Sequence, residues 1–209
     1  MAQRHLLSPI ARGIFFDIPS DMASLERYYV LATDDLDLIG SRRGAENRLG
    51  LAIHIALLRH PGQGWRDSDQ IPQEVIHWLS DQIHVSTSAL DIYGNRESTR
   101  AAHRVLAIKH LGLRPFLRAD FRAALELATQ AAFGTDEGAT IMRGLLAGLA
   151  GAKLVYPSTV SLERIGLAGR ARARRLAAQD LNDALNVDQQ AALQDLLIKD
   201  PSLGISRLA

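Results

Sequence analysis

Cysteine is absent from the 209 residues, which excludes disulfides, zinc–thiolate sites and a cysteine nucleophile. Aromatic residues are scarce, at 5%. The N-terminal sequence lacks the apolar run of a signal peptide. The longest apolar stretch, 144–156, is interrupted by Lys153 and is too short to cross a bilayer. These absences favour a cytoplasmic protein that makes no membrane contact.

Leucine, alanine and arginine dominate the composition, and 47% of the residues are hydrophobic. Such a composition favours helices that pack through leucine and alanine. Helical periodicity recurs along the chain, and no convincing alternation of the kind that marks a strand is found. We therefore predict an all-α fold.

The segment 40–61 changes character along what reads as a single helix. Its second half is apolar on nearly every side, and a helix of that kind is buried. We predict that this apolar second half, called the shaft below, is buried, and that the basic first half, called the tip, projects from the protein. We predict Ser41 as the N-cap of the helix. The polar residues of the tip are Arg42, Arg43, Asn47 and Arg48.

An internal repeat relates this segment to a second one, because a shift of 54 residues aligns 36–42 with 90–96. In each copy a short helix stops at a glycine, and a capped helix with a basic start follows. This is the order of a helix-turn-helix, in which the start of the second helix contacts base edges. Divergent helical repeats with solvated arginines explain the repeat equally well.

Three regions follow from the repeat. We predict helix-turn-helix-like modules over 1–66 and 67–134, and a helical extension or linker over 135–209. The extension carries a run of basic residues without interspersed acids. We interpret the run as a track for phosphates in preference to a solvated face or an intermolecular contact. Its members are Arg164, Arg170, Arg172, Arg174 and Arg175.

No sequence pattern indicates catalysis. The glycine-rich stretch 144–153 lacks the ending of a phosphate-binding loop, and no serine nucleophile elbow is present. Glu74 and His77 have the spacing of half a metal site without the other half. His54, on an apolar face, is expected to be a hydrogen-bonded core histidine. We predict no catalytic residue, no metal ligand and no cofactor in this chain.

Two blocks of the sequence carry a family pattern. The first contains Arg43-Gly44, Asn47-Arg48-Leu49-Gly50-Leu51-Ala52 and Leu57-Leu58-Arg59-His60-Pro61-Gly62. The second contains Tyr93-Gly94, Arg96, Thr99-Arg100, His103 and Leu111-Gly112-Leu113-Arg114-Pro115-Phe116. Both blocks resemble the N-terminal region of Tn-three-type replicative transposases. Leu51 and His60 depart from the usual Phe and Tyr. The resemblance covers essentially the whole chain and weakens after Phe133.

The resemblance implies that this chain binds the terminal inverted repeats of a transposon as double-stranded DNA, at the nucleoid. The family's catalytic centre, three acidic residues on an RNase-H-like fold with a divalent metal, lies far downstream of such a region. We therefore expect a chain that is not itself an enzyme, either a fragment or a naturally truncated relative. Self-association in a transposition complex is left open.

The candidate DNA contacts lie at the starts of the two second helices. They are Arg42, Arg43, Asn47 and Arg48 at one site, and Arg96, Thr99, Arg100, His103 and Arg104 at the other. Arginine suits guanine edges and phosphates, and asparagine suits adenine. The alternative is a helical protein-interaction or assembly module, or a truncated relative that inhibits a transposase. An independent metal-dependent nuclease is least favoured, because no carboxylate set is visible.

Overall fold

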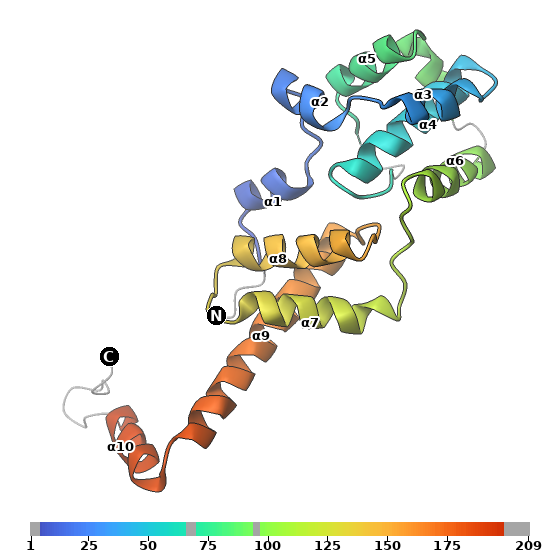
Figure 1. Cartoon of the computed structure of the whole chain (residues 1–209). Coiled ribbons are helices and arrows are strands. Elements are labelled where there is room, and N and C mark those ends of the chain that lie inside the picture. The colour runs from blue at the N-terminus through green and yellow to red at the C-terminus, as the bar shows by residue number, and fades with distance from the viewer. Residues whose placement is uncertain (1–4, 66–69, 94–96, 199–209) are drawn as a thin grey trace.

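The computed structural model describes residues 5–65, 70–93 and 97–198, which form eleven helices and no strand (Figure 1). The prediction of an all-α fold is confirmed. Ten of these helices are α-helices and η1 is a 3-10 helix. They are α1 (Pro9–Phe16), α2 (Met22–Tyr28), α3 (Thr33–Gly40), α4 (Ala45–Arg59), α5 (Gln73–Gln82), η1 (Thr87–Ile92), α6 (Glu97–His110), α7 (Asp120–Ala132), α8 (Gly138–Gly151), α9 (Thr159–Ala184) and α10 (Val187–Leu197).

The start of α4 differs from the prediction. Ser41 does not cap this helix; it follows α3, and its hydroxyl donates to the carbonyl oxygen of Leu38 at 2.6 Å. Residues 41–43 form a turn, and Gly44 is the N-cap of α4 with φ 86°. Only glycine adopts this backbone conformation at little cost, so Arg42 and Arg43 lie on a turn that glycine permits, whereas Arg48 lies within α4.

Buried apolar side chains form two clusters. The first surrounds α4, whose residues Leu49–Leu58 are all buried, as predicted for the shaft. It gathers α2, α3, α5, η1 and α6. The second joins α1 to α7, α8 and α9. Helices on both sides of the 66/67 boundary pack on α4. The division of the chain at 66/67 and 134/135 stays a prediction.

The basic run on α9 is partly engaged within the chain. Arg172 pairs with Glu126 of α7 at 2.8 Å, and Arg174 pairs with Asp136 at 2.7 Å. These pairs fasten α9 to α7 and to the segment that follows α7. Beyond Ala173, α9 has no buried residue and extends away from the other helices, with α10 at its end (Figure 1). The interpretation of the run as a phosphate track stays a prediction.

None of the helices in the described ranges is both long and apolar enough to span a bilayer.

Candidate nucleic-acid interface

Residues from both predicted contact sites line one depression. The start of α4 and the start of α6 together line a depression of about 390 Å³. Five of the nine predicted residues lie in its wall, from both copies of the repeat. The lining residues are Arg42, Arg43, Asn47, Ser98, Thr99, Ala102 and His103.

Two hydrogen-bonded side chains stand on the α4 side. The guanidinium of Arg42 donates to the Ser41 hydroxyl at 2.9 and 3.1 Å. The amide of Asn47 donates to the Arg43 carbonyl at 2.8 Å and to the Glu46 carboxylate at 3.1 Å. These are bonds within the turn and the first turn of α4, so they hold both side chains at the edge of the depression.

Arg48 does not line the depression. It is half-buried, and its Nε atom is buried without a hydrogen-bond partner in the described part of the chain. The Arg48 side chain therefore packs against the body of the protein, whereas Arg43 is exposed.

On the α6 side, Thr99 and Arg100 are half-exposed, and Arg104 is exposed with its guanidinium against Gly64. The predicted contact Arg96 lies outside the described residues. Sequence reasoning missed Ser98 and Ala102. Their small side chains give no chemical signal, although Ala102 lies three residues from Thr99 and therefore on the same helical face.

His103 lines the depression and forms part of its wall, and it is 7% exposed. Its ring stacks on Tyr93, with centroids 5.7 Å apart and planes at 10°. Its Nδ1 atom lies 3.0 Å from the Tyr93 hydroxyl in a hydrogen bond. Burial lowers the pKa of His103, and the nearby Arg42 acts in the same direction. The ring is therefore a neutral, fixed group, and its role as a DNA contact stays a prediction.

An aromatic cluster lies beneath this wall. The Tyr93 ring occupies the space above Gly50, where an added Cβ atom would lie 2.1 Å from Cε2 of the ring. Trp65 stacks on Tyr93 at 5.5 Å between centroids. The glycine at position 50 is thus needed for the tyrosine that supports His103.

His54 adjoins the same cluster, with its ring centroid 5.4 Å from that of Trp65. It is a core residue, as predicted, but the expected hydrogen bond is wrong. Both ring nitrogens are buried and have no partner among the described residues. Burial lowers the pKa of His54 to about 4, and His103, Arg104 and Arg100 add to the effect. The imidazole is therefore neutral near pH 7.

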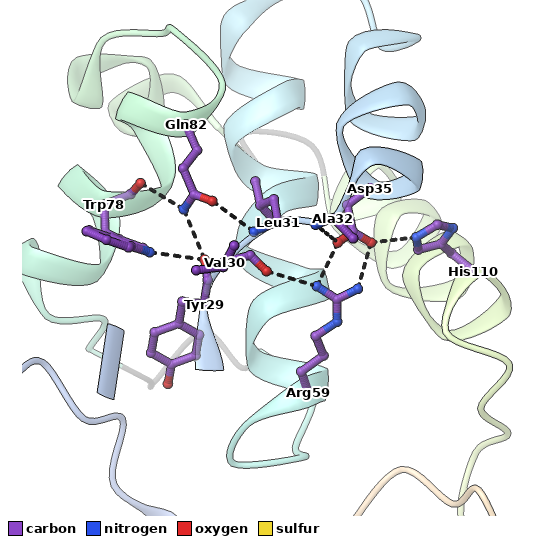
Figure 2. Close-up of polar contacts among 9 residues, drawn as sticks. All are labelled: Tyr29, Val30, Leu31, Ala32, Asp35, Arg59, Trp78, Gln82 and His110. Carbon is purple, nitrogen blue, oxygen red and sulfur yellow. Dashed lines mark hydrogen bonds and ion pairs between the residues drawn. The ribbon is translucent and has the colours of Figure 1, made fainter. Parts of the chain in front are cut away.

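A second polar feature joins the far ends of the same helices (Figure 2). Asp35, in the first turn of α3, is fully buried and accepts hydrogen bonds from Arg59 and His110, the last residues of α4 and α6. Burial opposes ionisation of Asp35, but these bonds outweigh it and hold the pKa of the carboxyl below its ordinary value. Asp35 is therefore an ionised group that connects three helices.

The extended segment before α3 is held by α5 (Figure 2). The indole N–H of Trp78 donates to the Tyr29 carbonyl at 3.1 Å. The Gln82 amide donates to the same carbonyl at 3.0 Å and accepts from the Leu31 N–H at 2.8 Å. These bonds fix the chain that leads into Asp35.

Among the described residues, no group of three histidine, aspartate or glutamate side chains is arranged to hold a metal ion.

This all-α chain matches a known protein family. Residues 6–169 match the family described as Domain of unknown function (DUF4158). Because the match covers well over half of the sequence, the chain belongs to this family.

Comparison with characterised proteins shows that the chain is similar to transposases. The chain is 34% identical over 197 residues to the transposase for transposon Tn501 of Pseudomonas aeruginosa, covering 94% of this chain and 20% of that protein. It is 30% identical to the transposase for transposon Tn1546 of Enterococcus faecium, covering 93% of this chain and 20% of that protein. For the transposase of transposon Tn3926 of Escherichia coli the identity is 30%, with coverage of 100% and 21%.

The chain spans about a fifth of the length of these relatives. It corresponds to an N-terminal region of Tn-three-type transposases, which confirms the family predicted from the two sequence blocks.

Proposed function

We propose that this chain binds the terminal inverted-repeat DNA of a transposon in a sequence-specific manner, as the N-terminal part of a transposase. The observation that carries the proposal is the single depression shared by the starts of α4 and α6. We propose further that the chain supplies recognition only and that a divalent metal belongs to a catalytic region outside it.

The chemistry of the depression suits DNA. Its edge presents the guanidinium groups of Arg42 and Arg43, which suit phosphates and guanine edges, and the amide of Asn47, which suits adenine. The opposite side presents hydroxyls, from Ser98 and Thr99, which hydrogen-bond bases or phosphates. Because both sides belong to one depression, the proposal is that the two tips contact one continuous stretch of a duplex.

Binding should be selective and salt-dependent. Fluorescence anisotropy with a duplex of the terminal repeat and a scrambled duplex of equal length measures both properties. If about six phosphates are neutralised, log affinity falls with log salt at a slope of about −5. Equal affinity for the two duplexes would contradict sequence-specific binding, and it would favour the alternative of an assembly module.

Individual arginines should contribute differently to the affinity for the terminal repeat. Arg100→Ala, on α6 beside the depression, is expected to weaken binding to the terminal repeat by about tenfold, within the range of a good base contact. Arg122→Ala, at an exposed position on α7, is the matched control and should change affinity by less than about twofold. Equal losses in the two variants would contradict the assignment of α6 as a recognition helix.

A further inference from the structure

The two recognition helices run side by side in the same direction. Their first residues meet at the depression, where Asn47 of α4 and Thr99 of α6 both line the wall. Their last residues meet at Asp35, which bonds to Arg59 of α4 and His110 of α6. One end of the pair therefore carries the proposed contacts, and the other end carries a buried ionic junction.

The junction uses both carboxylate oxygens of Asp35. Arg59 binds in a bidentate manner, with Nη1 2.6 Å from Oδ2 and Nη2 2.8 Å from Oδ1. The Nε2 atom of His110 donates to Oδ1 at 2.7 Å, because an ionised carboxylate can only accept. The backbone N–H of Ala32 donates to Oδ2 at 2.7 Å. Short, charge-assisted bonds of this kind fix the orientation of the groups that they join.

We propose that Asp35, Arg59 and His110 form a clamp that sets the separation of the α4 and α6 tips, with His110 as the positioning residue for α6. A small change at the clamp is amplified at the tip, since the 14 residues of α6 extend about 21 Å. A rotation of about 5° at the clamp therefore moves the tip by about 2 Å, more than a preorganised binding site tolerates.

His110 is the member that can be changed with the least damage. Its loss leaves the bidentate pair between Arg59 and Asp35 in place, so the carboxylate stays compensated. The His110 side chain is 20% exposed, whereas the Asp35 side chain is 1% exposed. Removing His110 thus releases the end of α6 without leaving an isolated buried charge.

The separation of the tips can be measured without DNA. Because the chain has no native cysteine, Arg43→Cys and Ala101→Cys give a doubly spin-labelled protein for pulsed electron spin resonance. We expect a narrow distance distribution with His110 present and a shift or broadening of about 2 Å or more in His110→Leu. His110→Gln should restore the narrow distribution, because its amide N–H can donate to Asp35. The exposed neighbour gives the matched control, Lys109→Leu, which should leave the distribution unchanged.

Two results would overturn the clamp: the same distribution in His110→Leu as in the parent, or equal broadening in His110→Leu and His110→Gln. The consequence for recognition rests on the proposed function. With native residues at 43 and 101, His110→Leu should weaken binding to the terminal repeat by about tenfold, and His110→Gln should restore it. Unchanged affinity in His110→Leu would reject the positioning role. Absence of DNA binding by the parent would reject the proposed function, while the distances still decide the clamp.

Discussion

Gly50→Ala is expected to destabilise the protein by roughly 3 kcal/mol, which is large for the addition of one methyl group. The new Cβ atom would lie 2.1 Å from Cε2, 2.2 Å from Cζ and 2.5 Å from Cδ2 of Tyr93. The ring has little freedom to retreat, because Trp65 stacks on it and its hydroxyl is bonded to His103. The gain of about 1 kcal/mol from alanine in a helix offsets only part of this cost.

Urea unfolding followed by circular dichroism measures the effect, and the chain supplies a matched control. Gly40 also lies in a helix, but a Cβ atom there meets nothing within 4 Å. Gly40→Ala should therefore be neutral or stabilising by up to about 1 kcal/mol. Tyr93→Ala should remove most of the penalty of Gly50→Ala when the two changes are combined, because the clash then has no partner. A Gly50→Ala variant as stable as Gly40→Ala would contradict the packing.

Local sequence signals account for much of the fold. The Ser8 hydroxyl caps α1 with proline at its first turn, and Asp21 caps α2 by accepting from the Ser24 N–H at 3.1 Å. The all-apolar second half of 40–61 is buried as expected. These features depend on residues within a few positions of one another, which a single sequence displays directly.

The features of the candidate site that were missed depend on long-range packing. Asp35 lies in the first turn of α3, where a carboxylate favours the positive end of the helix, but it also binds side chains 24 and 75 residues away. The repeat placed the two tips at equivalent positions, but whether they meet depends on the direction of α6 relative to α4. His103 is a predicted DNA contact on a basic face. It is, however, buried against Tyr93, ten residues away, to which it is hydrogen-bonded. None of these relations has a local pattern.

His54 should make the free energy of unfolding strongly dependent on pH. In the fold its pKa is about 4, whereas an unfolded histidine titrates near 6.5. Below pH 6.5 the unfolded state therefore binds the extra proton, and stability falls as the pH decreases towards 4. The shift corresponds to a loss of about 3 kcal/mol across this window. Burial also lowers the pKa of His60 and His103, so both histidines act in the same direction.

Asp35 contributes in a different window. Its folded pKa lies below the ordinary value, so its stabilising effect is present above that value and is lost only as the pH falls through the folded pKa. A loss of stability between pH 6.5 and 4 therefore reports the histidines. A further loss at more acidic pH reports the aspartates whose pKa is lowered, among which Asp35 is the buried one.

His54→Leu separates these contributions. Leucine removes the titrating group and two buried nitrogens that have no partner within the described residues, so we expect a flatter pH profile and a variant more stable than the parent at pH 5. Urea unfolding at a series of pH values measures this, with the exposed His77→Leu as the matched control that keeps the parent's slope. A parent and a His54→Leu variant that lose equal stability between pH 6.5 and 4 would show that His54 is not buried and neutral. The same profile bears on recognition, because His54 lies beneath the wall formed by Tyr93 and His103, and protonating it adds a buried positive charge there.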